Sequence, residues 1–483
     1  MHTFDVLIIG AGPAGVCAAL RLLALGYRVA MIESQRFPRA QIGESLSPGI
    51  RNIFDYLGAA HLLHQDHCLH HLPAQVAWHE PVATWQPRGH GLMTDRGRLD
   101  HDLLNLAVAK GLYLFQPAKY EQAVFDGTHW QVTLREASVA RTLSCIFLLD
   151  ARGRKGIAQS QRVLTAPPML GMWAYTDARH MPAATSVAAV PEGWLWGSPL
   201  HDGRYRVLAF TDPQSVKKQS AHACYRQLLQ ASDLFRQAFN TTASLSLQTC
   251  PVFCYVHEQP WHQNRVQLGE AAFAPDPLSS TGVEKTMRLS LQAVIAIHTV
   301  FKKGTAALAK EFYENKLIAS VVNHTRWTAQ YYSEAWPGSA HPFWKNRSAI
   351  QVPEQAATPF THRLKAMLHQ PAAPALPAPQ QYHTQQKLRD LWHKKMYLSP
   401  AVTYLDTPCV IDDCVQLKTA IQHPNLESEM AFIGHNDIIP LLDMARRCTH
   451  FGQLALHWQQ LVPAPVAAQM VIMLWEKQIL CEA

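Results

Sequence analysis

Apolar and polar residues in the first third of the chain follow the pattern of an α/β unit. Residues 4–33 predict a strand, a glycine-rich turn, a helix and a second strand that ends in an acidic residue. Strand and helix patterns then alternate as far as the apolar run CIFLLDARG at 145–153. We therefore predict that residues 1–167 form the first part of an α/β domain.

The pattern changes to short strands with turn residues between 168 and 260. GWLWGSPL is followed by HDGRYRVLAF, with a turn at Asp202 and Gly203. These residues predict a mostly antiparallel sheet that is inserted into the first domain. RVQLGEAAFAPDP then restores the strand-and-glycine pattern, and a long amphipathic helix runs from about Gly282 to Phe301. We assign 261–305 to the second part of the α/β domain.

The remaining residues predict a helical region, a linker and a small module. Residues 306–370 have helical patterns and are rich in Trp and His, whereas QPAAPALPAPQQ has no period and predicts a semi-rigid linker over 371–386. Residues 387–483 predict one helix, two short strands, three helices and a final apolar strand.

Composition excludes several classes of protein. The 483 residues carry a net charge of +7 and contain no block of five like charges, so we expect no nucleic-acid partner. No apolar run reaches the roughly 18 residues that span a bilayer, and Met1 leads directly into a strand, so we expect a cytoplasmic protein without a membrane segment. None of the ten cysteines lies in a CxxC pair, and we expect neither disulfides nor a metal site.

The glycine-rich turn GAGPAG has the spacing of a dinucleotide-binding motif. Gly10 allows the tight turn, Gly12 lets the backbone approach a pyrophosphate, and Gly15 lets the helix pack closely on the strand. Glu33 ends the next strand, where a carboxylate accepts hydrogen bonds from the hydroxyls of an adenosine ribose. Because strand, spacing, helix and acid agree, an accidental glycine cluster is the weaker interpretation.

Four further segments resemble those of the single-component flavoprotein monooxygenases and the flavin-dependent halogenases. RFPRAQIGESL is similar to the family's loop across the flavin, RGRLDHDLLNLA to its helix whose arginine lies over the cofactor, and LLDARGRKG to its Asp-x-x-Gly segment. LGEAAFAPDPLSSTGVEKT resembles its GDxA…DP…GV segment, with Glu270 in place of the usual Asp. The resemblance implies FAD as cofactor. It implies these cofactor-binding residues: Gly10, Gly12, Pro13, Ala14, Gly15, Glu33, Arg36, Glu44, Ser45, Arg98, Asp150, Gly269, Glu270, Pro277, Ser280, Thr281, Gly282 and Val283.

The resemblance also implies the fold. We expect an α/β protein with an FAD-binding Rossmann-like domain of the glutathione-reductase type and an inserted antiparallel substrate sheet. The C-terminal module resembles a winged-helix domain, and it is similar to small peptide-recognition domains of enzymes that modify ribosomally made peptides. A structural cap or a dimer surface is the alternative for this module.

Side chains distinguish oxygen transfer from halogenation within this family. The halogenases hold hypohalous acid on a lysine in the strand after the IGES helix, but this sequence has no lysine before Lys110. The glutamate that tryptophan halogenases place before Ser-Thr-Gly is Ser279 here. The WxWxxP signature survives as Trp194, Trp196 and Pro199, although ordinary ring packing also explains it. These losses favour hydroxylation of an aromatic ring through a flavin C4a-hydroperoxide.

The sequence AQVAWHEP occupies the place of the absent lysine. His79 and Glu80 are the candidates to take a proton from an aromatic substrate, although a surface role is the commoner one for a histidine. No second GxGxxG is present for a pyridine nucleotide. The resemblance therefore implies O₂ as co-substrate and NAD(P)H, or another outside reductant, as a transient electron donor.

The chain most resembles the flavoprotein monooxygenases that form tryptophylquinone cofactors, as in the maturation of quinohemoprotein amine dehydrogenase. This resemblance implies a peptide or protein substrate, in which a tryptophan side chain is hydroxylated, and docking by the C-terminal module. The alternatives are a small-molecule aromatic hydroxylase or halogenase of secondary metabolism and a non-enzymatic flavoprotein.

Overall fold

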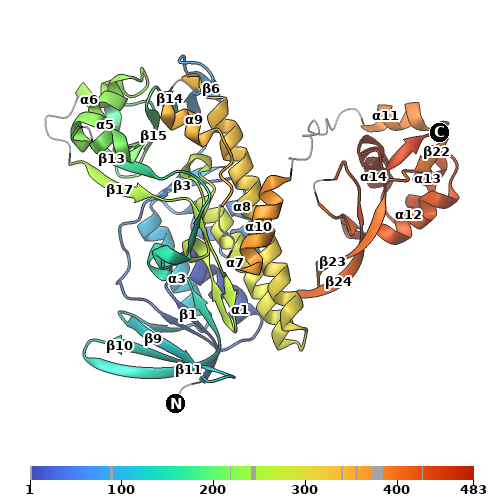
Figure 1. Cartoon of the computed structure of the whole chain (residues 1–483), viewed down its shortest axis with the longest axis horizontal. Coiled ribbons are helices and arrows are strands. Elements are labelled where there is room, and N and C mark those ends of the chain that lie inside the picture. The colour runs from blue at the N-terminus through green and yellow to red at the C-terminus, as the bar shows by residue number, and fades with distance from the viewer. Residues whose placement is uncertain are drawn as a thin grey trace. The chain divides into compact units, whose positions relative to one another are not determined.

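The computed structural model describes residues 3–86, 91–217, 219–240, 246–338, 341–353, 357–370, 384–426 and 428–483. The chain divides into two compact units, shown in Figure 1. The first comprises Met1–Ile297 and Tyr313–His369, and the second comprises His298–Phe312 and Gln370–Ala483. The second unit therefore includes a piece of the preceding helical region as well as the C-terminal module.

A largely parallel sheet organises the first unit. Among the described strands it has eight members, with the order β19-β20-β11-β1-β2-β8 and with β9 and β10 attached as an antiparallel extension of β11. The strands are β1 (Thr3–Ile9), β2 (Val29–Ile32), β8 (Tyr113–Phe115), β9 (Lys119–Phe125), β10 (Trp130–Glu136), β11 (Val139–Asp150), β19 (Trp261–His262) and β20 (Arg265–Gln267). β1 pairs in parallel with both β2 and β11. All four residues of β2 are buried, as expected for a strand covered on both faces.

The second sheet of this unit is formed mainly by the inserted residues. Its strand order is β17-β13-β16-β15-β14-β5-β6. The strands are β5 (Ala74–Ala77), β6 (Thr84–Gln86), β13 (Met169–Asp177), β14 (Thr185–Val190), β15 (Gly193–Pro199), β16 (Arg204–Thr211) and β17 (Gln248–Val252). All neighbours are antiparallel except β14 and β5, which are parallel. We refer to it as the substrate sheet, after the role that the resemblance implies for it.

Two of its strands lie before the predicted start of the insert at 168. β5 has four residues, too few to register as a strand from periodicity alone, and its pairing with β14 joins residues more than a hundred positions apart. β20 meanwhile adds to β11, so the chain returns to the first sheet after the insert. This arrangement confirms the predicted α/β fold with an inserted antiparallel sheet.

Two small sheets and a set of helices complete the first unit. One sheet contains β12 (Arg162–Leu164), β18 (Tyr255–His257) and β21 (Phe273–Ala274), and the other contains β3 (Ser45–Leu46), β7 (Leu92–Thr94) and β4 (Cys68–His70). The helices are α1 (Pro13–Ala24), α2 (Ile50–Tyr56), α3 (Arg96–Ala109), α4 (Pro213–Lys217), α5 (Ala221–Gln230), α6 (Arg236–Asn240), α7 (Gly282–Phe301), α8 (Ala306–Ser333), α9 (Pro342–Arg347) and α10 (Pro359–His369). The last residues of α7 and the first residues of α8 belong to the second unit. The bounds of α7 agree with the helix expected from its amphipathic pattern.

No helix in the described ranges is both long and apolar enough to cross a membrane.

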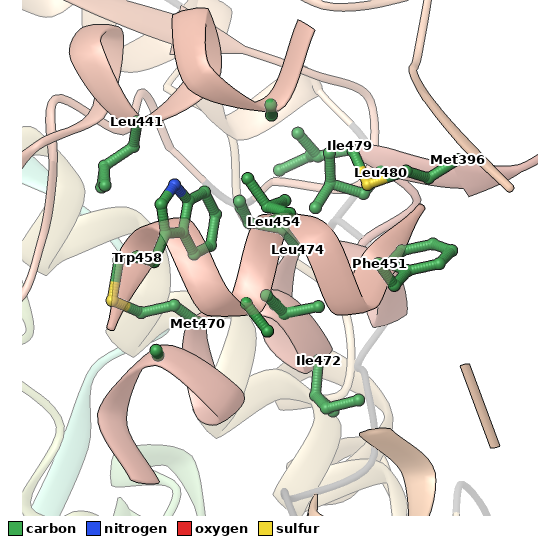
Figure 2. Close-up of a cluster of buried hydrophobic side chains, with 14 of the residues drawn as sticks. Met396, Leu441, Phe451, Leu454, Trp458, Met470, Ile472, Leu474, Ile479 and Leu480 are labelled. Carbon is green, nitrogen blue, oxygen red and sulfur yellow. The ribbon is translucent and has the colours of Figure 1, made fainter. Parts of the chain in front are cut away.

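The second unit has its own hydrophobic core. Its elements are α11 (Thr384–Leu391), β22 (Met396–Leu398), β23 (Thr403–Ile411), β24 (Cys414–Gln422), β25 (Phe432–Ile433), β26 (Asn436–Asp437), α12 (Ile438–Arg447), α13 (Phe451–Trp458), α14 (Ala464–Glu476) and β27 (Leu480–Glu482). β23 and β24 form a two-stranded ribbon, and β22 pairs with β27. Figure 2 shows side chains of α12, α13 and α14 converging with Met396 and Leu480 from that strand pair. The sequence predicted only two strands before the last three helices, because β22, β25 and β26 are too short to show a period. The winged-helix assignment stays a prediction.

Two leucines of α13 test the importance of this core. Leu454 is completely buried, whereas Leu456 is 53% exposed. We expect Leu454→Ala to lower the free energy of unfolding by about 2–5 kcal/mol, because it removes buried methyl groups and leaves a cavity. Leu456→Ala should change it by less than about 0.5 kcal/mol. Urea unfolding of the full chain, monitored by hydrogen exchange in peptides from 438–480, measures the change in unfolding free energy for each variant. Equal effects would contradict the described core.

Candidate functional site

The turn between β1 and α1 brings backbone segments unusually close together. Gly10 has a φ of +103°, and a Cβ there would lie 2.5 Å from the carbonyl oxygen of Ala151. A Cβ on Gly15 would lie 2.1 Å from the carbonyl oxygen of Gly10. Both glycines are therefore required by the packing of α1 against its own sheet.

Gly12 differs, because no packing contact among the described residues requires a glycine there. In that part of the chain, a Cβ at Gly12 would have only the guanidinium of Arg39 within 4 Å, at 3.9 Å. Gly12 is also the N-cap residue of α1, and no side chain caps that helix end. The first turn of α1 therefore offers backbone N–H groups and a positive dipole beside open space. This arrangement fits the pyrophosphate of a dinucleotide.

Glu33 lies beside the same turn. Its carboxylate accepts hydrogen bonds from the backbone N–H of Ala11 at 2.9 Å and of Gln35 at 2.7 Å, and its side chain is almost completely buried. A carboxylate has about four acceptor positions, so capacity remains for a ribose hydroxyl. The acid that the sequence assigned to ribose binding is held in place by the backbone on either side.

The segment after β20 contacts the start of α1. Gly269 has a φ of +59°, and a Cβ there would lie 2.8 Å from the Cβ of Ala14. Glu270 pairs with Arg154 at 3.2 Å and remains 41% exposed, so its carboxylate is accessible. The predicted residues Gly269 and Glu270 are thus brought to the glycine turn.

The rest of this segment leads into α7. Pro277 begins a single helical turn that the carboxylate of Asp276 caps, and Ser280 has the left-handed conformation, with a φ of 52°. Thr281 hydrogen-bonds through its hydroxyl to Ser279 at 2.7 Å. Gly282 and Val283 then open α7. The predicted flavin-contacting residues therefore form one continuous loop and helix start.

Asp150, at the end of β11, is completely buried among arginines. Its carboxylate accepts from Arg152 at 2.7 and 2.8 Å and from Arg265 at 2.6 Å. A Cβ on Gly156 would lie 2.7 Å from this carboxylate. In the described contacts, Asp150 holds the loop after β11 against β20, and its role toward the cofactor stays a prediction.

The loop around Glu44 is anchored on both sides. Glu44 forms an ion pair with Arg206 of β16, and both side chains are buried. The hydroxyl of Ser47 donates to the carboxylate of Glu284 in the first turn of α7. Ser45 lies in β3 and pairs with Met93. The predicted flavin loop is therefore connected to the substrate sheet and to α7.

Two arginines at the start of α3 have different environments. Arg96 is buried, donates to both carboxylate oxygens of Asp100 at 2.9 and 3.0 Å, and donates to the carbonyl of Gly43 at 3.2 Å. The charges of Asp100, Glu44 and Glu270 raise the pKa of Arg96 against the opposing effect of burial. Arg98, the residue that the resemblance indicated, is 45% exposed and pairs with Asp66.

Sequence reasoning missed Arg96. The sequence did carry a signal for it, because Arg96 and Asp100 are four residues apart on a predicted helix, a spacing at which their side chains can form an ion pair. Arg36, the other predicted arginine, is exposed.

The two candidate catalytic residues lie at the end of β5. His79 and Glu80 are both exposed, and Nδ1 of His79 lies 3.2 Å from the carbonyl oxygen of Glu334. The described contacts of His79 are to residues of and just after α8, and none is to the glycine turn. Their catalytic role stays a prediction.

Among the residues that the structure describes, no group of three or more His, Cys, Asp or Glu could hold a metal ion.

The WxWxxP signature belongs to an aromatic cluster. Trp194 is buried and stacks on Phe210, with the ring centroids 4.0 Å apart. It also meets Trp78 edge to face. These contacts are those of a packed core.

The comparisons with known proteins agree with this geometry. The family model described as tryptophan halogenase matches residues 5–86 and 88–404. A tryptophan 2-halogenase of Chondromyces crocatus is 28% identical over 337 residues, which are 64% of this chain and 64% of that enzyme. A putative FAD-dependent oxidoreductase, LodB of Marinomonas mediterranea, is 22% identical over 74% of this chain and 100% of its own length.

Two solved structures match almost the whole chain. The peptidyl tryptophan dihydroxylase QhpG, essential for tryptophylquinone cofactor biogenesis, has a TM-score of 0.72 at 20% identity and covers 98% of this chain and 99% of its own. The flavin-dependent halogenase CmlS has a TM-score of 0.77 at 20% identity and covers 100% and 96%. At this identity the two structures establish the fold that they share with this chain.

The different demands on Gly12 and Gly15 give a test of the cofactor site. We expect Gly12→Ala to keep the thermal stability of the apoprotein but to lose bound FAD, because the added methyl group takes the space of the pyrophosphate. Gly15→Ala should lower the melting temperature of the apoprotein itself, since it forces α1 away from Gly10. The FAD-to-protein absorbance ratio and thermal unfolding by circular dichroism measure the two effects. A Gly12→Ala protein that retains FAD would contradict the site.

Arg96 and Arg98 give a second test. Arg96→Gln leaves Asp100 buried without its guanidinium partner, and we expect a loss of about 3–5 kcal/mol in the free energy of unfolding. Arg98→Gln removes a solvent-exposed pair and should leave stability nearly unchanged. Urea unfolding of the two apoproteins, beside FAD titration of each, separates structure from binding. Unchanged FAD affinity in Arg98→Gln would remove Arg98 from the cofactor site.

Proposed function

Because the chain belongs to the tryptophan halogenase family, we propose that it is an FAD-dependent monooxygenase that hydroxylates an aromatic ring. The proposed substrate is a tryptophan side chain of a partner polypeptide, and the proposed role is quinone cofactor biogenesis. Bound and reduced FAD would supply the activated oxygen. The turn at Gly10–Gly15 with Glu33, the loop around Glu44, and the segment from Gly269 to Val283 would hold it.

The composition of β5 is the observation that carries this proposal. β5, the strand in which the resemblance would place the lysine, spans Ala74–Ala77, and the buried Trp78 follows it. It contains no lysine, and the sequence has none before Lys110. Chlorine transfer in the relatives that the sequence resembles uses such a lysine, whereas hydroxylation requires only an electron-rich ring positioned near the oxidant.

The exposure of His79 and Glu80 supports a polypeptide substrate. Both side chains are accessible at the end of β5, so an aromatic side chain of a second protein can reach them without entering a closed cavity. We assign to one of them the acceptance of the proton that leaves the ring when oxygen is added. The likeness to QhpG over both units supports the same class of substrate.

The second unit is proposed to dock the polypeptide. The β23–β24 ribbon exposes the apolar side chains Tyr404, Val410 and Leu417. The outer edge of β23 has no described strand beside it, since β23 pairs only with β24 in the part of the chain that the structure describes. A peptide added as a strand would gain backbone hydrogen bonds there, and the exposed apolar side chains would select it.

A small-molecule halogenase is the second candidate. The relatives include a tryptophan 2-halogenase and a flavin-dependent halogenase, and one lysine lies next to the predicted flavin loop. Lys285 follows Glu284 in the first turn of α7, and burial lowers the pKa of its ammonium group. Chlorination of a free aromatic compound, lost in Lys285→Gln, would favour this candidate.

Intact mass of a candidate polypeptide measures the proposed reaction. The FAD-loaded enzyme, NAD(P)H, O₂ and chloride are incubated with the polypeptide. We expect a gain of one or two oxygens located on a tryptophan, and a lower rate in His79→Gln or Glu80→Gln. Chlorine in place of oxygen on the product would refute the proposal.

An exposed leucine tests the docking role. We expect Leu417→Asp to raise the KM for the polypeptide without changing FAD content, because a charge replaces an apolar contact on the ribbon. Val139→Asp is the matched control, since Val139 is also an exposed apolar residue on a strand but belongs to the first unit. Equal KM values for the two variants would exclude the ribbon as the docking surface.

A further inference from the structure

Four aromatic side chains form a continuous series from the predicted flavin segment to the surface. Tyr332 is buried beside Asp276, Trp78 lies next to it, Tyr331 follows, and Trp327 is 42% exposed. The centroid distances along the series are 6.3 Å from Tyr332 to Trp78, 4.9 Å from Trp78 to Tyr331, and 5.1 Å from Tyr331 to Trp327. We call these four residues the aromatic series.

Each position in the series is held by specific contacts. The indole N–H of Trp78 donates to the carbonyl oxygen of Tyr331 at 2.8 Å, which fixes the strand end against α8. Tyr331 and Trp327 are four residues apart on α8 and stack with an interplanar angle of 18°. These contacts hold the rings beside one another, and Trp78 links the buried end of the series to the exposed end.

The inner end of the series has a hydrogen-bonded base. The hydroxyl of Tyr332 donates to both carboxylate oxygens of Asp276, at 3.2 Å each. Asp276 caps the turn at Pro277–Ser279, directly before the residues predicted to contact the flavin. Burial raises the pKa of Asp276, so this carboxyl is suited to hold a proton that Tyr332 releases.

Tyr and Trp are among the protein side chains that most readily lose one electron, and phenol oxidation also requires a proton acceptor. We propose that the aromatic series conducts oxidising equivalents from the flavin site to the surface when no substrate takes up the activated oxygen. The inference rests on the proposed function, because it requires bound FAD that reacts with O₂. It assigns Tyr332, Trp78, Tyr331 and Trp327 a protective function beyond aromatic hydroxylation.

The steps balance in electrons and protons. Tyr332 gives one electron to a flavin-derived one-electron oxidant and its phenolic proton to Asp276. Trp78 returns an electron to Tyr332, which recovers the proton from Asp276. Trp78 then takes an electron from Trp327 across the Tyr331 ring, which lies between them and keeps its phenolic proton. A soluble thiol gives one electron to oxidised Trp327 and releases one proton as it becomes a thiyl radical. The protein is then restored and the oxidant has been reduced by one electron.

Flash excitation of the bound oxidised flavin tests the series without any substrate. Blue light makes oxidised flavin a one-electron oxidant, and transient absorption detects the tryptophan radical. In the FAD-loaded full chain we expect this radical, with a lifetime that added thiol shortens. Trp78→Phe should abolish it, and Trp327→Phe should abolish its response to thiol, because phenylalanine is not oxidised.

Trp130→Phe is the matched control. Trp130 is a buried tryptophan of β10 that packs in a different core cluster, so this variant should keep the radical and its thiol response. FAD content and circular dichroism establish that each variant is folded. No radical in the parent enzyme, or an unchanged radical in both Trp78→Phe and Trp327→Phe, would overturn the inference.

The two proposals fail in different ways. The flash experiment requires only bound FAD, so a radical without polypeptide hydroxylation leaves the series intact and removes the proposed function. Hydroxylation of the polypeptide without a tryptophan radical would support the proposed function and exclude electron transfer through the aromatic series. During turnover without substrate, peptide mass spectrometry should find oxygen on Trp327 in the parent enzyme and on Trp78 or Tyr331 in Trp327→Phe. The same oxidation pattern in both proteins would also overturn the inference.

Discussion

The close approach of α1 to the central sheet is the constraint on which the first unit depends. Gly10 lies against Ala151, Gly15 lies against Gly10, and Gly269 lies against Ala14, with room for a side chain at none of these glycines. Three segments that are far apart along the sequence meet at this point. Within the GAGPAG turn, the described packing does not require Gly12 to be a glycine, and Gly12 borders the open space where a pyrophosphate would lie. The position of α1 thus determines the packing of the core and the geometry of the predicted cofactor site.

Buried charge connects this cofactor region to the substrate sheet. Glu44 belongs to the loop expected to cross the flavin, and its partner Arg206 belongs to β16. Removing either partner would leave an uncompensated charge in the interior, at a cost of several kcal/mol. The loop and the sheet are therefore held in one arrangement, and the Ser47–Glu284 hydrogen bond adds the start of α7 to it. A substrate on the sheet and a flavin beneath the loop would share these supports.

The fold alone does not separate halogenation from hydroxylation, since structures of both kinds of enzyme match almost the whole chain. The distinction must come from side chains near the reacting atoms. β5 illustrates this, because a strand that reads Ala-Gln-Val-Ala, without a lysine, leads to Trp78 and the exposed His79. Trp78, directly after this strand, also links the two ends of the aromatic series, so under both proposals the same short segment would affect substrate choice and the fate of unused oxidant.

Local signals determined the parts of this protein that were predicted from sequence alone. The glycine spacing, the apolar run of β1, the acid at Glu33 and the period of α7 each depend on residues within one or two elements, and each was visible without a structure. Only the tertiary structure decided which arginine of α3 faces inward, that Glu44 pairs with Arg206, that β5 joins β14, and that Trp78 meets Tyr331. These features depend on contacts between residues distant along the chain, and no local period encodes such contacts.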